Sequence, residues 1–380
     1  MNDHKHLILV GGGHSQLAVI KRLGLHPISG IKVSLISRDI QTPYSGMLPG
    51  LIAGHYRFSD AHIDLKALCT WANIELIHDS VITIDAEDQT LKTQQGNHFN
   101  YDWLSINIGS KPCLNSIDNA TQYGIPVKPI DSFLDNWQRI VDQIKQTTEP
   151  FTITVVGGGA ASVEVVLAVH YQLAKNNHHK LVRFRLICGK DLLSTHNKKV
   201  QEHFKRILTQ REIELITHCK ITEATENSLV TSDGGCFNTD AIILALHAGS
   251  QPWLAQSPIT TTDDGFICVN DHLQSLSHPN IFAAGDIIDF KTQPLAKSGV
   301  YAVREGEILA ENIYRCISQP QGDRQRITLK TFSAQKKFLS LMMTGDKHAI
   351  ASKGRFSVAG KWVWYWKNHI DKQFMKRHQL

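Results

Sequence analysis

Two glycine-rich turns are the residues best suited to carry chemistry, one near the start of the chain and one near its middle. Their sequences are Val10-Gly11-Gly12-Gly13-His14-Ser15-Gln16 and Val156-Gly157-Gly158-Gly159-Ala160-Ala161-Ser162. Each follows a short apolar run and opens a helical pattern. Glycines there let the backbone approach a diphosphate, which then lies at the positive end of the following helix. The pair predicts two dinucleotides held by one protein, with chemistry passing between them.

Each turn lies within a pattern of strand, helix and strand that is typical of a βαβ unit. The expected elements are strand 6–10, helix 14–24 and strand 31–37 in the first unit, and strand 153–156, helix 160–174 and strand 184–188 in the second. Both halves then close alike, because a buried strand ends in Gly-Ser-x-Pro at Gly109 and again at Gly249. An internal repeat of this kind is hard to produce by chance and indicates two related domains.

The repeat predicts an α/β protein with two Rossmann-like domains, the first of them discontinuous, and a small C-terminal α+β segment. Lys128-Pro129 marks the crossover between the halves, and an amphipathic helix is expected over residues 134–145. After Pro252 the chain is expected to return to the first domain. The expected limits are 1–115 with 253–327 for the first domain, 116–252 for the second, and 328–380 for the C-terminal segment, with a strand-like start and a helical tail.

The composition excludes several classes of protein. The chain has 380 residues, 42% of them hydrophobic, and its formal charge of +5 is too small for a nucleic-acid footprint. No apolar run approaches the ~18 residues of a membrane-spanning helix, and we expect a cytoplasmic protein. The seven cysteines form no Cys-x-x-Cys pair, and the histidines, including His178-His179 in a polar stretch, show no metal-ligand spacing. We therefore expect neither a disulfide framework nor a metal site.

Three further motifs carry a resemblance to a known superfamily. One is the loop Ala283-Ala284-Gly285-Asp286, whose carboxylate can accept a hydroxyl hydrogen bond, and the others are TPYSGMLPGLIAG at 42–54 and KSGVYAVREG at 297–306. Together with both glycine turns, they make the chain similar over nearly its whole length to the two-dinucleotide flavoproteins of the pyridine nucleotide-disulfide oxidoreductase superfamily. Within it, the chain resembles type II NADH dehydrogenases and the flavoprotein module fused to selenophosphate synthase in some bacteria.

This resemblance implies FAD in the first domain, NADH or NADPH in the second, hydride transfer from the nicotinamide to the flavin, and an electron acceptor that is a quinone or another molecule. The residues assigned to FAD are Gly11, Gly13, His14, Ser15, Gln16, Ser37, Arg38, Gly46, Met47, Val81, Gly109, Gly285 and Asp286. Those assigned to NAD(P)H are Gly157, Gly159, Ala160, Ser162, Glu164, Lys190 and Gly249. Glu164 has the one catalytic role, that of orienting the nicotinamide. The resemblance also leaves open a second function, that of a flavin-binding partner or regulator of selenophosphate synthase in selenium metabolism.

The turns depart from the family pattern at two places. Gln16 and Ser162 stand where the third glycine is usual, so we expect each helix to sit slightly further from its strand, with Gln16 still facing the FAD diphosphate. The acid that usually ends the second strand and binds ribose hydroxyls is missing as well. In the first domain Ser37 can still bond a hydroxyl, and Arg38 can pair with phosphate or lie across adenine.

Two specificities stay open. In the second domain, Cys188-Gly189-Lys190 brings no carboxylate against a 2′-phosphate, and Lys190 is either its partner or an ordinary surface lysine. Val300 and Arg304 stand nearest to the paired glutamines of type II dehydrogenases, so the acceptor is a quinone, another molecule or a protein. Lys128 either reaches the cofactors or is a solvated loop lysine.

The tail over 361–377 has a basic amphipathic pattern. Trp362, Trp366, Ile370 and Phe374 recur at helical spacing, and five cations oppose one aspartate. The pattern is typical of a helix that lies on an anionic membrane surface, which would place the protein peripherally on the inner face of the cell membrane. The same stripe suits a helix that packs its aromatic side chains on the body of the protein or across a homodimer.

Overall fold

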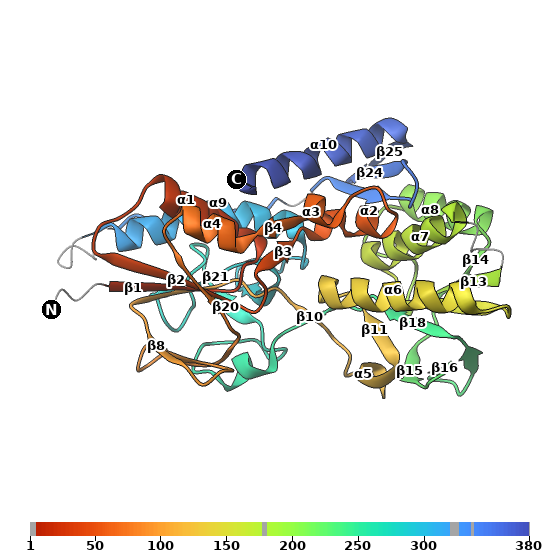
Figure 1. Ribbon diagram of the computed structural model, residues 1–380, viewed down its shortest axis with the longest axis horizontal. Helices are drawn as coiled ribbons and strands as arrows, with labels where there is room; N and C mark the ends of the chain where they lie inside the picture. Colours follow the sequence, from red (N-terminus) through yellow and green to blue (C-terminus); the bar gives the residue numbers. More distant parts are fainter. Residues whose placement is uncertain (1–4, 177–180, 320–326, 336–337, 380) are drawn as a thin grey trace.

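A five-stranded parallel sheet forms the centre of the first half of the molecule, in the order β21-β9-β1-β2-β5 (Figure 1). The computed structural model describes residues 5–176, 181–319, 327–335 and 338–379, so His178-His179 lies outside the described residues. The strands are β1 (Lys5–Val10), β2 (Ile31–Ser37), β5 (Glu75–His78), β9 (Trp103–Ile106) and β21 (Ile281–Ala283). β1 pairs with β2 and β9, and its apolar side chains are buried, as a central parallel strand requires.

The second half repeats this sheet, in the order β11-β18-β12-β13-β14. Its strands are β11 (Gly124–Pro126), β12 (Phe151–Val156), β13 (Val182–Ile187), β14 (Ile213–Ile216) and β18 (Ala241–Leu244). The predicted α/β fold with two Rossmann-like halves is confirmed, because β9-β1-β2-β5 and β18-β12-β13-β14 have the same parallel order. β21 follows the second sheet in the chain yet pairs with β9, so the first sheet is built from two separate stretches.

Each glycine turn leads from a strand into a helix, β1 into α1 and β12 into α7, and further helices follow later in each half. They are α1 (His14–Leu25), α4 (Leu65–Trp71) and α9 (Gly299–Ile317) in the first half, and α6 (Ile130–Gln146), α7 (Ala160–Lys175) and α8 (Lys198–Gln210) in the second. α1 packs closely on α9, because a Cβ atom at Gly306 would lie only 3.0 Å from Ser15 Cα. α6 confirms the predicted amphipathic helix, since its buried side chains recur every three or four residues.

Short antiparallel elements fill the connections. Two matched three-stranded meanders precede β9 and β18, namely β6 (Val81–Asp85), β7 (Thr90–Thr93) and β8 (His98–Asn100), and β15 (Ile221–Ala224), β16 (Ser228–Thr231) and β17 (Cys236–Asn238). The remaining strand pairs are β3 (Gln41–Pro43) with β4 (His62–Asp64), β10 (Lys111–Pro112) with β19 (Ala248–Gly249), and β20 (Ile267–Val269) with β22 (Ile288–Phe290). The short helices are η1 (Ser45–Met47), α2 (Leu48–Ile52), α3 (Phe58–Ala61), α5 (Ala120–Tyr123), η3 (Pro252–Gln256) and η4 (Gly285–Ile287). β10 and β19 carry the two Gly-Ser-x-Pro closures, which therefore pair with each other.

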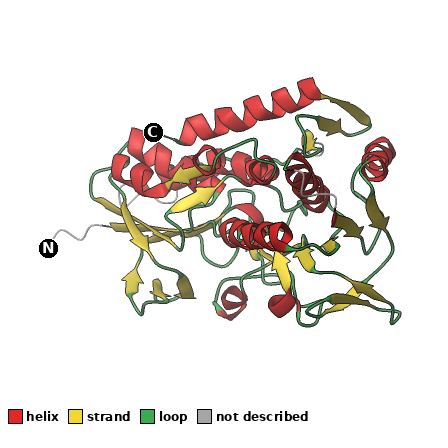
Figure 2. Ribbon diagram, turned by 45° about the vertical axis from the view of Figure 1, so that its right-hand side comes forward, coloured by secondary structure: helices red, strands yellow, loops and turns green. Residues whose placement is uncertain are grey.

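The C-terminal segment is a hairpin sheet followed by one long helix. Its elements are β23 (Ser340–Met343), β24 (Ala349–Lys353), β25 (Phe356–Gly360) and α10 (Lys361–His378). The expected order of strands followed by a helix is observed, but the first described strand begins later than expected, since 327–335 contains no strand and β23 begins at Ser340. α10 runs above both halves, from α7 and α8 towards α1 (Figures 1 and 2). The helical tail is thus confirmed, and it contacts β4 of the first half as well as the C-terminal hairpin sheet.

Candidate functional site

The first glycine turn lies at the carboxyl end of β1, where the chain enters α1. Gly11 has φ +85°, a left-handed conformation that favours glycine. A Cβ atom at Gly11 would lie 2.6 Å from the carbonyl oxygen of Asn107, and one at Gly13 would overlap Asn107 Oδ1. Sequence analysis missed Asn107, although it follows directly on β9 and precedes Gly109 in the closing motif.

His14, the first residue of α1, presents a buried nitrogen without a hydrogen-bond partner. Its Nε2 atom is one of the orphaned buried polar atoms of the described residues. Burial lowers the pKa of His14 to about 4, so the ring is neutral near pH 7. The ring lies edge-on to Tyr44 and is tilted against Phe374 of α10, with ring centroids 5.3 and 5.6 Å away.

Asp286 is held by groups from three segments. Lys128 Nζ lies 2.9 Å from Asp286 Oδ2, and Ser110 Oγ donates to the same oxygen over 3.2 Å. Burial favours the neutral acid, but the Lys128 ammonium and the two hydrogen bonds outweigh it, so the pKa of Asp286 lies below its ordinary value. Lys128 is thus no free loop lysine, because it joins the crossover before α6 to the Ala-Gly-Asp loop.

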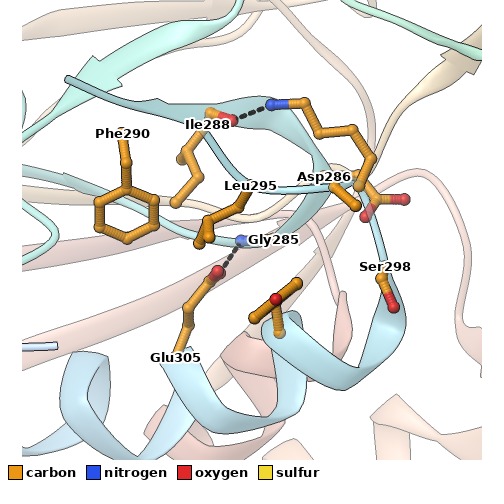
Figure 3. A pocket seen from close by; sticks show the side chains of 10 residues that line it. Gly285, Asp286, Ile288, Phe290, Leu295, Ser298 and Glu305 are labelled. Atoms are coloured by element: carbon orange, nitrogen blue, oxygen red, sulfur yellow. Dashed lines mark hydrogen bonds between the residues drawn. The ribbon is translucent and has the colours of Figure 1, made fainter. Parts of the chain in front are cut away.

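The Ala-Gly-Asp loop is also fixed from below by a buried carboxyl group (Figure 3). Glu305, on α9, is 2% exposed, and its Oε2 atom accepts a 2.6 Å hydrogen bond from the Gly285 N–H. Burial raises the pKa of Glu305 to about 7. Lys297 donates to the carbonyl oxygen of Ile288, and its ammonium lies 4.1 Å from the centre of the Phe266 ring. Sequence analysis missed Glu305 as a site residue, although it lies within the KSGVYAVREG motif and is an acid on the buried face of α9.

These features fit the FAD that the resemblance implies. Gly11 in the first turn is left-handed, His14 Nε2 has no protein partner, and no atom of the described residues lies within 4 Å of the Cβ position of Gly109. Asp286 offers an ionised carboxylate for a hydroxyl group. Gly46 and Met47 lie in η1, where Met47 is fully buried and Val81 opens β6.

Three of the residues assigned to FAD use their side chains elsewhere. Gln16 is wrong as a residue facing the diphosphate through its amide, because that amide bonds Ser105 on β9 and is completely buried. The Ser15 hydroxyl donates to Ala302 on α9 over 2.7 Å. The Arg38 guanidinium is committed to its neighbour Asp39, at 2.6 Å, and is directed neither at a phosphate nor at an adenine by the described contacts.

The second glycine turn repeats the first in outline. Gly157 has φ +143°, a Cβ atom there would overlap the Ala245 carbonyl oxygen, and Ser162 Oγ donates to Gly159 O over 2.7 Å. At the end of β13, Cys188 is fully buried and donates weakly to Gly157 O, while Lys190 is exposed. Ala160 opens α7, and Gly249 pairs with Lys111 in the β10–β19 ladder.

Glu164 lies on α7 against the C-terminal hairpin. Its Oε1 atom accepts a 2.7 Å hydrogen bond from the Met343 N–H of β23. Burial raises the pKa of Glu164 to about 7, although the Lys367 ammonium and this hydrogen bond oppose the rise. The carboxyl group therefore changes its charge near neutral pH.

A buried ion pair on α10 lies against the η1 segment. Sequence analysis counted both of its residues among the surface charges of the helix. Lys367 Nζ lies 2.6 Å from Asp371 Oδ2 and donates to Gly46 O over 2.6 Å. The two side chains are 7% and 5% exposed. Burial raises the pKa of Asp371 despite the neighbouring ammonium. Beside the pair, Tyr44 stacks on Phe374 with ring centroids 4.3 Å apart.

The outer face of α10 is aromatic. Trp362, Tyr365, Trp366 and Ile370 are 57, 59, 40 and 37% exposed, whereas Phe374 is 7% exposed. The alternative in which the stripe packs on the body of the protein therefore holds for Phe374 and is wrong for Trp362, Trp366 and Ile370. Within the described residues, no helix is both long and apolar enough to cross a bilayer.

Comparisons with known proteins agree with this geometry. The sulfide-quinone reductase of Aquifex aeolicus is 23% identical over 98% of this chain and 90% of its own, and the NADH dehydrogenase-like protein YutJ of Bacillus subtilis is 19% identical over 96% and 99%. The structure of NDH2 from Plasmodium falciparum in complex with NADH has a TM-score of 0.81 at 16% identity, over 98% of each chain. The sulfide:quinone oxidoreductase structure from Aquifex aeolicus also reaches 0.81, at 19% identity, over 99% of this chain and 91% of its own. The model of the family described as pyridine nucleotide-disulphide oxidoreductase matches residues 5–306. The chain therefore belongs to the pyridine nucleotide-disulphide oxidoreductase family of FAD- and NAD(P)H-binding proteins.

Proposed function

We propose that this protein is an FAD-dependent NAD(P)H oxidoreductase that passes electrons from a nicotinamide nucleotide to an acceptor. The observation that carries the proposal is the doubled site. In each of two matched parallel sheets, a central strand ends in a glycine turn with a positive φ. The charge of Asp286 is felt at His14 beside the first turn, and Glu164 lies on α7, the helix that the second turn opens. A protein that held a single nucleotide would need only one of these turns.

Bound FAD supplies the hydride acceptor, and the chain supplies position and charge. The first turn would offer the N–H groups of Gly12 and His14 to the diphosphate, and the Asp286 carboxylate would accept from a hydroxyl of the ribityl chain. Glu164 would hold the carboxamide of the nicotinamide and so select the ring face. With a pKa of about 7, Glu164 holds or releases a proton near neutral pH. Lys367 anchors the Gly46 carbonyl and keeps η1 beneath α10.

We further propose that NADPH is accepted at the second site. The place of the ribose-binding acid is taken by the buried Cys188, and Gly189 leaves the adjoining space open, with no described atom within 4 Å of its Cβ position. The nearest carboxylate of that loop, Asp191, is paired with His218 over 3.1 Å. Lys190 is exposed and free to meet a 2′-phosphate.

The acceptor reaches the flavin from the α10 side, and we propose that α10 rests on an anionic membrane surface. Its exposed tryptophans are flanked by Lys361, Lys372 and Lys376, which are also exposed. Aromatic rings beside cations suit the interface between headgroups and acyl chains. A quinone would be taken from that surface. Because Val300 and Arg304 stand in place of the paired glutamines of type II dehydrogenases, we also propose other molecules as acceptors. The selenophosphate synthase alternative rests on resemblance alone and stays a prediction.

The decisive experiment is anaerobic reduction of the purified protein. We expect a yellow protein whose flavin absorption bleaches on addition of NADPH or NADH and returns with a quinone or another acceptor from a panel. Glu164→Gln is the test variant, and Glu202→Gln, the same change at an exposed residue of α8, is the matched control. A protein that stays colourless with added FAD, or a flavin that neither nucleotide bleaches, would overturn the proposal.

A further inference from the structure

Asn107 and Ala245 hold equivalent positions beside the two glycine turns but differ in side chain. Asn107 follows β9 and donates its backbone N–H to Val10 O over 2.8 Å, and Ala245 follows β18 and donates to Val156 O over 2.9 Å. The carbonyl oxygens of both residues fill the space where the first glycine of the turn would carry a Cβ atom. The backbone contacts of Asn107 and Ala245 are therefore the same, whereas only Asn107 carries a polar side chain.

Asn107 binds three segments at once. Its Oδ1 atom accepts from the N–H groups of Ser15 and Gln16, over 3.1 and 3.2 Å, in the first turn of α1. Its Nδ2 atom donates to Ala284 O over 2.5 Å, immediately before Gly285. The residue is 2% exposed. The carboxamide thus caps α1 and holds the loop that carries Asp286, while the backbone carbonyl of Asn107 accepts from the Gly13 N–H of the glycine turn over 3.2 Å.

The same carboxamide explains why the turn and the loop need glycine. A Cβ atom at Gly13 would overlap Asn107 Oδ1, and one at Gly285 would lie 2.5 Å from Asn107 Nδ2. In the second turn, no atom of the described residues lies within 4 Å of the Cβ position of Gly159. α7 begins there without a side-chain cap, because Ser162 donates its hydroxyl to a carbonyl oxygen instead of accepting from an N–H.

We infer that Asn107 is the positioning residue that makes the first turn a retained FAD site, while its replacement by Ala245 makes the second turn a site for an exchanging nucleotide. A glycine turn that is already ordered loses little conformational entropy when its ligand binds, so the ligand binds tightly and leaves slowly. A turn that is ordered only by its ligand binds more weakly and releases sooner. The inference rests on the assignment of FAD to the first turn and the nicotinamide nucleotide to the second.

The test begins with wild-type protein that has been shown to bind FAD and to be bleached by NADPH, so that failure of the proposed function is recognised first. Asn107→Ala is then compared with Ser105→Ala, a control that removes another buried polar side chain of the same strand region. This control loses only the bond to the side-chain amide of Gln16 and keeps every bond of the Asn107 carboxamide. FAD affinity is measured by fluorescence titration of the apoprotein, and NADPH affinity by titration of the FAD-saturated, pre-reduced protein. We expect Asn107→Ala to raise the Kd for FAD by about tenfold or more, with unchanged NADPH affinity. An FAD affinity equal to that of Ser105→Ala would overturn the inference.

The reciprocal variant keeps the test decisive even where Asn107→Ala does not fold. Ala245→Asn leaves the FAD turn intact and directs a carboxamide into the open space beside Gly159. We expect stopped-flow displacement to show release of the nicotinamide nucleotide slowed by about tenfold, with FAD retention unchanged. Release at the wild-type rate or faster would contradict the inference.

Discussion

Replacing Lys367 by methionine removes the cation of the buried pair beneath α10 and leaves the Asp371 carboxyl group without its partner. The two groups lie 2.6 Å apart and are nearly inaccessible to water. Methionine keeps much of the length and the apolar stem of the lysine, so the change acts on charge more than on packing. The hydrogen bond from Lys367 to Gly46 O is lost as well.

Two estimates of the cost agree. Removing one partner of a buried ion pair typically costs about 3–5 kcal/mol. Independently, the folded variant must keep Asp371 protonated, and at pH 7 a group with an ordinary pKa of 3.8 takes up that proton at a cost of about 4 kcal/mol. The folded variant then binds a proton that the unfolded chain lacks, so its stability falls as the pH rises. We expect a loss of about 4 kcal/mol at pH 7 and of about 2 kcal/mol at pH 5.

The assay is urea unfolding of the FAD-loaded protein at both pH values, followed by circular dichroism. Lys372→Met, an exposed lysine on the same helix, is the matched control and should change the free energy of unfolding by no more than about 0.5 kcal/mol. The double variant Lys367→Met/Asp371→Leu should recover most of the loss, because no buried charge remains. A loss below about 1 kcal/mol at pH 7, or a double variant no more stable than the single one, would refute the reasoning.

Four further changes test other parts of the site. Burial raises the pKa of Glu164 from 4.5 to about 7, so wild-type stability should fall as the pH rises through this window, and urea titrations should show a flatter profile for Glu164→Gln; equal profiles would contradict the assignment. Glu305→Gln keeps an oxygen that accepts from the loop and should retain FAD on dilution, whereas Glu305→Leu should release it about tenfold more readily; equal retention by the two would count against the role of that hydrogen bond. Lys190→Glu should raise the KM for NADPH by about tenfold and leave the KM for NADH nearly unchanged in steady-state assays. An equal change in both KM values would contradict the proposed contact of Lys190 with the 2′-phosphate. Exchange of Trp362 and Trp366 for serine should abolish flotation with anionic liposomes while the flavin is still bleached, and undiminished flotation would exclude that face as the membrane contact.

The sequence alone was enough to predict the two βαβ units, their repetition and the family. Each of these depends on neighbours in the chain, since an apolar run, a glycine turn and a helical period are local patterns whose geometry is nearly the same in any protein. The strands around Val10 and Val156 and the helices that follow them were therefore found within about two residues of their observed ends.

The tertiary structure decided which polar side chains act. Asn107 lies in the closing motif before Gly109, but its role depends on α1 and on the loop before Gly285, which are far away in sequence. Lys367 and Asp371 have the spacing of a surface pair and become buried only because α10 packs over η1. Trp362 and Phe374 share one helical stripe, yet one is exposed and the other buried, because the surface beneath α10 comes from segments hundreds of residues earlier. Local periodicity predicts that a helix has an apolar face, but which surface that face contacts depends on the packing of the whole molecule.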